Sequence, residues 1–211
     1  EVNVPIYVAN IADGEYDAAL AVHRESNPFP AICGRVCPAF CETRCKRGEL
    51  DQSVAIRTLK RFMADQEKEQ WKPAILEDEK EESIAVVGGG PAGLTATLRL
   101  AQQGYQVTIL ESTPMLGGWM TLGIPEYRLP REQIEREISS ITGMKNVTVK
   151  TNTKVGKDVS LDELKEKHDA VLLAVGAMNS RKLGIPGEDC ADVLHGVDFL
   201  KSMNLGEDVS H

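Results

Sequence analysis

The sequence has no excess of positive charge, no long apolar run and few histidines, and these absences exclude several kinds of function. The net charge is −8 at pH 7, and an acidic chain without a basic face is poorly suited to non-specific nucleic-acid binding. No stretch approaches the ~20 apolar residues that span a bilayer, and no cationic, apolar leader opens the chain. We therefore expect a cytoplasmic protein that has no membrane span and binds no nucleic acid.

The use of histidine and cysteine narrows the chemistry further. The four histidines lie far apart in the sequence and lack the spacing of metal ligands. No Ser–His–Asp arrangement can be argued either, so we predict no catalytic residue within the chain. Four of the five cysteines, by contrast, lie in 33-CGRVCPAFCETRC-45. The odd total and the tight clustering fit a secreted disulfide framework poorly.

The cysteine segment has three other interpretations. Its cysteines recur every four residues, so a continuous helix would place their sulfurs along one buried apolar face. Pro38 argues against such a helix, because proline removes a backbone donor and clashes with the preceding turn. Four thiolates on irregular backbone suit tetrahedral zinc or an iron–sulfur cluster, and the spacing alone leaves these two open. The residues concerned are Cys33, Cys37, Cys41 and Cys45, with the basic residues Arg35, Arg44, Lys46 and Arg47 around them.

The N-terminal third of the chain is predicted to be helical. Apolar residues recur among acidic ones over 5–24, with a turn at Asp13–Gly14. A further helix is predicted from Val54 to about Trp71. Residues 1–72 are therefore predicted to form a small helical domain organised around the cysteines.

An acidic stretch separates this region from one of different composition. We predict a solvated linker at 73–83 and an incomplete Rossmann-like domain at 84–211, which makes the fold class α+β overall. The second region alternates strand and helix patterns. Strands are predicted at 84–88, 106–111, 146–151 and 169–175, and helices at 91–103, 130–141 and 160–168.

The strongest local signal is 84-IAVVGGGPAGLTATLRLAQQGYQVTILES-112. A Gly-x-Gly-x-x-Gly pattern directly follows a buried strand and opens a helix, and Glu111 ends the next strand. Gly88 permits the tight turn, Gly90 lets the backbone approach a pyrophosphate, and Gly93 allows close packing of helix on strand. The helix N-terminus offers free N–H groups to the phosphates. The pattern predicts a dinucleotide site, and the Glu111 carboxylate disfavours a 2′-phosphate there.

Several motifs together resemble one family. GGGPAGL followed by 116-LGGWMTLGIPEYRLP-130 resembles the FAD-binding half of two-dinucleotide flavoprotein reductases. 27-NPFPAICGRVCPAFCETRCKRGELDQSVAIRTLKRFMAD-65 ahead of it is similar to the small (beta) subunit family of NADPH-dependent glutamate synthase. The same module resembles the N-terminal part of dihydropyrimidine dehydrogenase and the large subunit of NADH-dependent ferredoxin:NADP oxidoreductase.

The resemblance implies cofactors and residue roles. It implies FAD and [4Fe–4S] clusters in the chain, with NAD(P)H bound at a domain outside it. Cys37, Cys41 and Cys45 match the family's cluster cysteines, and Cys33 is predicted as a fourth metal ligand. The predicted FAD contacts are Gly88, Gly90, Pro91, Ala92, Gly93, Glu111, Gly118, Trp119, Arg128, Val155, Ala174 and Gly176.

The chain also departs from the family pattern. Three residues separate Cys37 from Cys41, where many members have five, which resembles a subgroup seen beside hydrogenases and formate dehydrogenases. Lys60 stands where some members place a Gln or Glu ligand, and an ammonium group has no lone pair to donate. The family's upstream cysteines and its second glycine-loop domain are not in this sequence, so we expect a fragment or one piece of a split enzyme.

These observations predict an NAD(P)H-dependent FAD/iron–sulfur oxidoreductase subunit, not active alone, that transfers electrons to a partner. Expected partners are redox subunits such as the large subunit of glutamate synthase, or hydrogenase-, formate dehydrogenase- or ferredoxin-type proteins. Two alternatives stay open. One is a non-catalytic adaptor, stabilised by a structural metal, that docks between redox subunits. The other is a plain NAD dehydrogenase domain without flavin.

Overall fold

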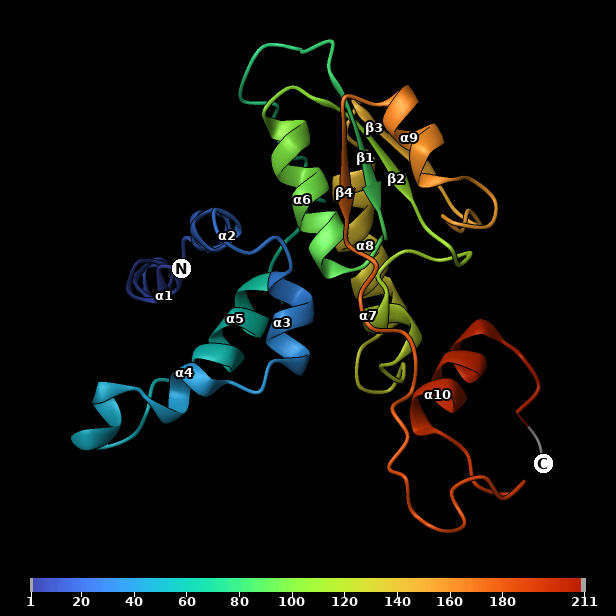
Figure 1. Ribbon diagram of the computed structural model, residues 1–211. Coiled ribbons are helices and arrows are strands. Elements are labelled where there is room, and N and C mark those ends of the chain that lie inside the picture. Colours follow the sequence, from blue (N-terminus) through green and yellow to red (C-terminus); the bar gives the residue numbers. More distant parts are fainter. Residues whose placement is uncertain (1, 210–211) are drawn as a thin grey trace. The chain divides into compact units, whose positions relative to one another are not determined.

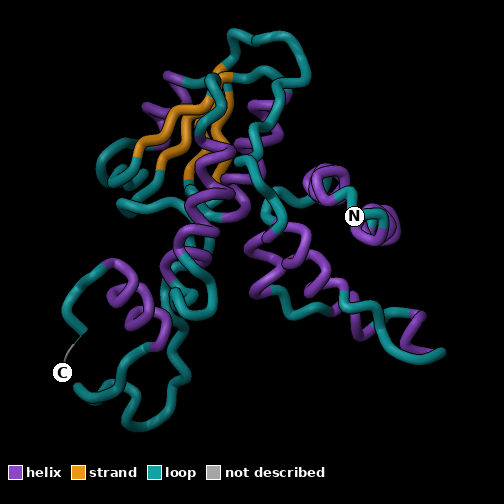
Figure 2. The backbone as a smooth tube through the Cα atoms, turned by 180° about the vertical axis from the view of Figure 1, so that it is seen from behind, coloured by secondary structure: helices purple, strands orange, loops and turns teal. Residues whose placement is uncertain are grey.

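The computed structural model of the protein describes residues 2–209, which fall into two compact units. The first unit is formed by the described residues up to Trp71 together with Tyr127–Glu137, and the second by Lys72–Glu126 together with the residues from Ile138 onward. Residues 127–137 follow the glycine loop in sequence but belong to the helical unit. No helix within residues 2–209 is long and apolar enough to cross a membrane. The combination of a helical unit with a parallel-sheet unit confirms the predicted fold class (Figures 1 and 2).

The first unit consists of short helices. The predicted turn at Asp13–Gly14 is confirmed, because Gly14 has a left-handed φ of +81° between two helices. The helix predicted to reach Trp71 ends earlier, at Asp65, and the Arg136 guanidinium binds the backbone carbonyls of Glu67 and Glu69 beyond it. The elements are α1 (Val4–Ala12), α2 (Tyr16–Arg24), α3 (Pro30–Val36), α4 (Phe40–Thr43), the 3-10 helix η1 (Lys46–Glu49) and α5 (Ile56–Asp65).

The core of the first unit joins α1, α2 and α5, and α3 packs against α5. Tyr7 and Met63 are completely buried, and the Tyr7 hydroxyl donates a hydrogen bond to the carbonyl of Ile56 (3.3 Å). The two helices α3 and α5 approach closely at Gly34, where a Cβ atom would lie 2.7 Å from Cα of Arg61. Only glycine therefore fits at this crossing, which brings α3 and its cysteine against α5.

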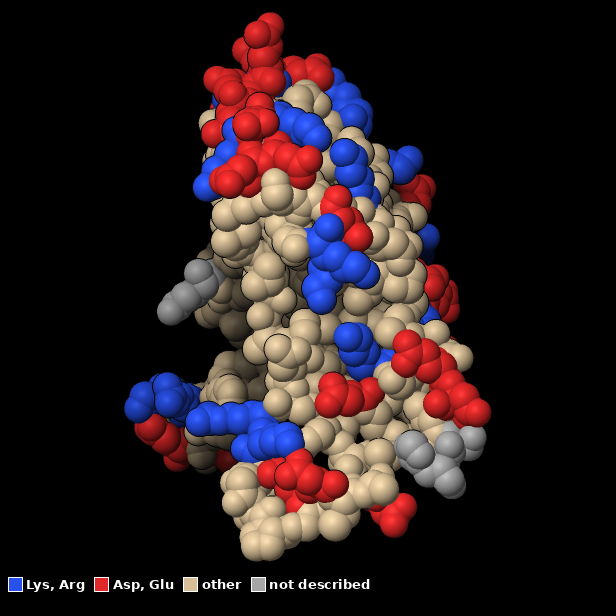
Figure 3. Space-filling view, turned by 45° about the vertical axis from the view of Figure 1, so that its right-hand side comes forward, with Lys and Arg blue, Asp and Glu red and all other residues tan. Residues whose placement is uncertain are grey.

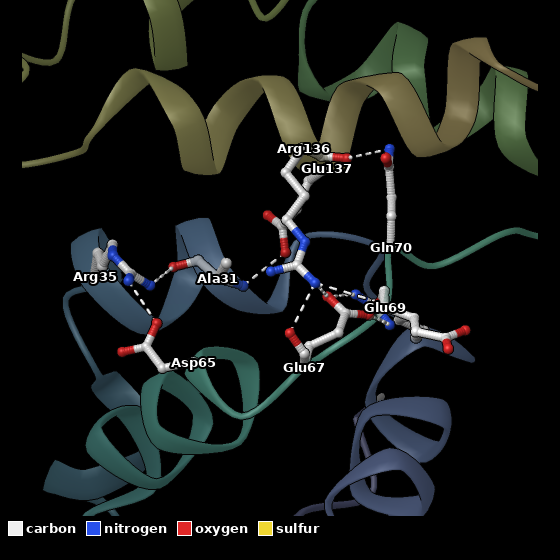
Figure 4. A network of polar contacts seen from close by, with 9 residues as sticks. Ala31, Arg35, Asp65, Glu67, Glu69, Gln70, Arg136 and Glu137 are labelled. Atoms are coloured by element: carbon white, nitrogen blue, oxygen red, sulfur yellow. Dashed lines mark hydrogen bonds and ion pairs between the residues drawn. The ribbon is translucent and has the colours of Figure 1, made fainter.

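Helix α8 (Arg131–Thr142) contributes a buried carboxylate to the first unit (Figure 4). Glu137 accepts hydrogen bonds from the backbone N–H groups of Ala31 (2.7 Å) and Ile32 (3.1 Å), which are free at the start of α3. Nearby, Glu67 pairs with the Arg24 guanidinium through both oxygens, at 2.5 and 3.0 Å. The network fixes the N-terminus of α3.

Burial moves the pKa values of two side chains in this unit in opposite directions. Desolvation raises the pKa of Glu137 to about 7, against the two backbone hydrogen bonds and Arg24, which lower it; Glu67 adds to the rise. Desolvation and the charge of Lys60 lower the pKa of His23 to about 4. In both side chains the fold therefore favours the neutral form more than the unfolded chain does.

The second unit contains a four-stranded sheet in the order β3-β2-β1-β4, with every pair parallel. Each predicted strand is confirmed, with ends one or two residues shorter in places. The strands are β1 (Ser83–Val87), β2 (Gln106–Leu110), β3 (Val147–Lys150) and β4 (Ala170–Leu173), and the helices are α6 (Pro91–Gln102), α7 (Trp119–Leu122), α9 (Leu161–Lys167) and α10 (Gly196–Leu205).

Helices cover both faces of the sheet at β1 (Figure 1). Val86 faces α6, because a Cβ atom on Gly93 would lie 3.2 Å from its side chain. Ala85 and Val87 point to the other face, where they pack with Leu164 of α9. The chain runs outward from β1 to β2 and β3 and then returns to β4 on the other side of β1. The crevice of such a sheet lies at this reversal, outside the carboxyl ends of β1 and β4.

The acidic segment before β1 is exposed but bound to the second unit. The backbone N–H of Lys80 donates to the carbonyl of Gly104 (2.9 Å), and Glu79 pairs with Lys145 (3.1 Å). Figure 3 shows acidic and basic side chains gathered at the end of the unit where the strands begin. The segment therefore lies along the turn between α6 and β2.

Helix α10 was not predicted from the sequence. It packs near α7, and the side-chain amide of Asn204 donates to the carbonyl of Leu122 (2.8 Å). Gly206 ends it in a left-handed conformation (φ +76°), which is a common helix stop. Gly206 is the sequence signal for the end of this helix, and the apolar pattern before it is too short to predict a helix by itself.

Replacement of Gly93 tests the close packing of α6 on the β1 loop. In Gly93→Ala the new Cβ would lie 1.9 Å from the carbonyl oxygen of Gly88, so the helix must shift. We expect the free energy of unfolding to fall by about 3 kcal/mol in urea titrations followed by circular dichroism. Gly90→Ala is the matched control, because its Cβ has no neighbour closer than 3.8 Å, and a Gly93→Ala chain as stable as the control would contradict this packing.

The two buried ionisable groups make opposite contributions to stability between pH 4.5 and 7. The contribution of Glu137 is fully present below its unfolded pKa and is lost as the pH rises through about 7. That of His23 is present above its unfolded pKa and is lost as the pH falls through about 4. Where both groups titrate, the fall in stability that Glu137 causes with rising pH is offset by the gain in stability that His23 causes.

Glu137→Gln removes the pH dependence of stability that comes from Glu137 and leaves the one that comes from His23. We expect the free energy of unfolding of Glu137→Gln, relative to the unsubstituted chain, to rise by about 3 kcal/mol from pH 4.5 to pH 7. Urea titrations at several pH values measure this difference. Glu135→Gln, at an exposed position of the same helix, should show no such trend. A constant difference for Glu137→Gln would mean that the carboxyl titrates normally.

Candidate functional site

The cysteine segment is not one continuous helix. Cys33 lies within α3, Cys37 follows it, Cys41 lies in α4 and Cys45 precedes η1. The break occurs at Pro38, as predicted: Cys37 is extended (ψ 134°), as a residue before proline prefers, and Ala39 is left-handed (φ 59°). The interpretation of the four sulfurs as one apolar helix face is therefore wrong.

Three of the sulfurs accept hydrogen bonds from nitrogen donors. The side-chain amide of Asn27 donates to Sγ of Cys33 (3.3 Å), and the backbone N–H of Ala39 donates to Sγ of Cys37 (3.4 Å). Burial raises the pKa of the Cys33 thiol, whereas backbone hydrogen bonds from Val54 and Arg47 lower the pKa of Cys45. Such donors stabilise negative charge on sulfur.

Most of the basic residues predicted around the sulfurs are paired with carboxylates. Ion pairs join Arg35 to Asp65, Lys46 to Glu49 and Arg47 to Asp51. Lys60 differs, because it is buried on α5; its positive charge opposes the rise that burial causes in the pKa of the Cys33 thiol. Lys60 departs from the family pattern in sequence, but its burial could not be predicted from that position.

The four cysteines of the segment are ligands of the chemical type that holds an iron–sulfur cluster. All five cysteines are free thiols within the described range; four of them lie in α3, in α4 and on the backbone that follows each of these helices, and three of these accept N–H donors. Among residues 2–209 no group of three or more His, Cys, Asp or Glu side chains converges closely enough to hold a metal ion. The assignment of Cys33, Cys37, Cys41 and Cys45 as ligands stays a prediction. Cys190 is exposed and lies in the other unit.

The glycine loop occupies the carboxyl ends of β1, β2 and β4. Gly88 has φ +111° and donates its N–H to the carbonyl of Leu110 (2.8 Å), and a Cβ there would lie 2.3 Å from the carbonyl oxygen of Ala174. Ala174 donates its own N–H to the carbonyl of Val87 (2.7 Å). The predicted residues Gly88 and Ala174 are thus brought together at the point where the strand order reverses.

A second glycine pair forms a surface without side chains. Cα atoms of Gly90 and Gly118 face each other, and a Cβ on Gly118 would lie 3.0 Å from Cα of Gly90. Gly90 is the N-cap residue of α6, and Pro91 and Ala92 in the first turn of this helix are exposed. The first N–H groups of a helix have no partner within it and carry partial positive charge. This cradle fits a pyrophosphate, because no side chain keeps an anion away from the backbone.

Glu111 binds the glycine loop as well as its own turn. One carboxylate oxygen accepts the N–H of Gly89 (2.9 Å), and the other accepts from the backbone N–H (2.8 Å) and hydroxyl (3.0 Å) of Thr113 and from the hydroxyl of Ser112 (3.1 Å). The side chain is buried. The Glu111 oxygen that accepts the Gly89 N–H has only this one donor, whereas the other Glu111 oxygen already has three. The first oxygen is therefore the better placed to accept a hydrogen bond from a ribose hydroxyl.

The remaining predicted contacts are more dispersed. Trp119 is half-buried, and its indole N–H donates to the carbonyl of Ala177 (3.0 Å), while Gly176 is exposed after β4 with φ +66°. Val155 is half-buried and pairs with Val159 in an isolated bridge. Arg128 is exposed and belongs to the first unit, so its approach to the flavin stays a prediction.

Comparison with known families supports both halves of this description. Residues 1–72 match the family described as dihydropyrimidine dehydrogenase domain II, 4Fe-4S cluster. Residues 82–209 match the pyridine nucleotide-disulphide oxidoreductase family.

Individual relatives agree with these matches. The chain is 39% identical to the beta subunit of NADP(+)-dependent formate dehydrogenase from Moorella thermoacetica, over 96% of the chain and 32% of the relative. It is also 39% identical to the glutamate synthase [NADPH] small chain of Bacillus subtilis, over 89% of the chain and 38% of the relative. The chain thus spans about a third of these proteins.

A solved structure is similar to part of the chain. FprA of Mycobacterium tuberculosis in complex with NADPH matches with a TM-score of 0.55 and 31% identity, over 59% of this chain and 29% of FprA. The second family match covers more than half of the chain. The protein therefore belongs to the pyridine nucleotide-disulphide oxidoreductase family and carries a 4Fe-4S domain ahead of it, as expected for a relative of the glutamate synthase small chain.

Proposed function

We propose that the chain is the electron-transfer part of a flavoprotein oxidoreductase subunit, with FAD on the glycine loop and a [4Fe–4S] cluster on the cysteine segment. The observation that carries the proposal is the cradle of Gly90 and Gly118, which lies at the reversal of strand order in a chain that also has a 4Fe-4S domain. Bound FAD supplies the conversion between hydride and single-electron chemistry, and the protein supplies position and charge.

Each residue group has a defined task in this proposal. The exposed N–H groups at the start of α6 bind the FAD pyrophosphate, and the free capacity of Glu111 binds a ribose hydroxyl. Cys33, Cys37, Cys41 and Cys45 hold the cluster. Flavin-side contacts come from Trp119, Arg128, Ala174 and Gly176, and an adenine-side contact comes from Val155. None of these tasks requires an acid or base within the chain.

The proposal extends to a partner and a second nucleotide. The relatives reported above are named as subunits or as a small chain, which supports a partner redox subunit that receives single electrons. A hydrogenase-, formate dehydrogenase-, ferredoxin- or glutamate synthase-type partner fits this role. NAD(P)H reduces the flavin from a domain outside residues 1–211. An adaptor with a structural metal and no flavin is the opposing proposal.

Metal and flavin content separate these proposals. After anaerobic reconstitution with iron, sulfide and FAD, we expect the chain to retain iron, and Cys41→Ser to lose most of it because a hydroxyl does not replace a thiolate ligand. Cys190→Ser is the matched control, because this cysteine is exposed in the other unit, and it should keep its iron. Zinc without iron, together with no flavin absorbance, would contradict electron transfer and favour the adaptor.

Gly90→Ala tests the flavin cradle apart from the fold. Gly90 has extended backbone (φ −78°), and an added Cβ has no contact closer than 3.8 Å, so the folded chain tolerates it. The methyl group would occupy the path of the pyrophosphate, and we expect FAD affinity to fall about tenfold or more in fluorescence titrations. Gly196→Ala, with open space around the added Cβ, should bind FAD as before. Equal affinities of the two variants would place FAD elsewhere.

A further inference from the structure

Trp119 joins two segments that lie far apart in the sequence. It is the first residue of α7, and its indole N–H donates a hydrogen bond to the backbone carbonyl of Ala177 (3.0 Å), 58 residues later. Trp119 is half-buried, whereas Ala177 lies in the exposed segment that follows β4. One side chain thus connects the start of α7 with the chain beyond the sheet.

The glycine loop and α7 fix the position of this donor. The backbone N–H of Gly117, two residues before Trp119, donates to the carbonyl of Gly89 in the glycine loop (2.7 Å). The indole ring lies against the end of α7, because a Cβ atom on Gly123 would be 2.6 Å from Cε3 of Trp119. The indole N–H is therefore held by the same loop that forms the cradle for a pyrophosphate.

The segment that accepts this hydrogen bond becomes exposed as it leaves the sheet. Ala174 is fixed at the glycine loop, where its carbonyl oxygen would lie 2.3 Å from a Cβ atom on Gly88. Val175 is 61% exposed, and Gly176 has a φ of +66° with open space where a Cβ atom would lie. The indole bond at Ala177 therefore anchors the segment beyond the point where packing on the sheet ends.

These contacts form a closed circuit at the carboxyl ends of β1 and β4. The circuit runs from the glycine loop through Gly117 to Trp119, across the indole bond to Ala177, and back along the chain to Ala174 and Gly88. In a parallel sheet of this topology a dinucleotide binds in the crevice at this place. The circuit therefore borders the site proposed for FAD, and the Trp119 side chain is the link that crosses from α7 to the segment after β4.

We propose that Trp119 is a positioning residue for FAD, whose indole N–H holds residues 174–177 at the border of the cofactor site and slows the release of FAD. A segment that is already held in place loses less conformational freedom when a ligand binds. Trp119 acts here through Ala177, in addition to any contact of its ring with the flavin. The inference rests on the proposed function, because it takes the crevice at the glycine loop as the FAD site.

Two substitutions of Trp119 separate the hydrogen-bond donor from the ring. Trp119→Phe keeps an aromatic ring against Gly123 and removes the N–H. Trp119→Gln removes the ring and keeps a donor, since the amide nitrogen of glutamine is the same number of bonds from Cα as the indole nitrogen. Trp71→Phe is the matched control, because it changes the other tryptophan of the chain, which belongs to the first unit.

The rates of FAD release and FAD binding are measured on the full chain by the change in flavin fluorescence after rapid dilution and after rapid mixing. We expect Trp119→Phe to release FAD about fivefold faster, because one hydrogen bond is lost, with a binding rate within about twofold of the unsubstituted chain. Trp119→Gln and Trp71→Phe should both release FAD within about twofold of the unsubstituted rate. A general loosening of the fold would lower the binding rate as well.

The outcomes separate this inference from the proposed function. An unsubstituted chain that binds no FAD contradicts the proposed function and the inference with it. A chain that binds FAD, with Trp119→Phe releasing it at the unsubstituted rate, overturns the inference alone, whether or not Trp119→Gln releases it faster. Equally fast release from both Trp119 variants overturns it too, since the donor then has no effect of its own. Loss of the native circular dichroism spectrum in Trp119→Phe also overturns it, because Trp119 then serves the fold.

Discussion

The second unit depends on backbone approaching backbone at the turn from β1 to α6. A side chain at Gly93 would collide with the Gly88 carbonyl at 1.9 Å, and one at Gly88 would collide with the Ala174 carbonyl at 2.3 Å. These contacts join the helix, the loop and the end of β4 into one surface. The cradle of Gly90 and Gly118 is the open part of that surface. The glycines that allow this packing are therefore adjacent to those of the proposed pyrophosphate site.

Sequence patterns predicted this unit well because its signals are local. Strand, loop, helix and acid of the glycine motif lie within 84–112, and each element has its own periodicity or spacing. The end of α5 at Asp65 was not predicted, and the Arg136 guanidinium that binds the backbone beyond it lies far along the chain. The break at Cys37 could be predicted from Pro38 alone, since proline restricts its own residue and the preceding one.

The polar groups around Cys33 could not be predicted in the same way. Glu137 lies 106 residues from Ala31, and a glutamate inside an amphipathic helix gives no sign that it caps another helix. Asn27 was part of a recognised motif, but its donation to sulfur depends on the fold of the loop before α3. Lys60 lies on α5 and is buried, which its charge gave no reason to expect. The fold class, the glycine loop and the break in the cysteine segment could thus be predicted from sequence, whereas the groups that affect charge at the sulfurs required tertiary structure.

The central claim is that one chain passes electrons between a flavin and an iron–sulfur cluster. The most direct measurement is anaerobic photoreduction of the flavin in the reconstituted chain, with the cluster followed by electron paramagnetic resonance. The account predicts that the signal of the reduced cluster grows as the flavin absorbance bleaches. A flavin that bleaches fully while the cluster stays oxidised would contradict it.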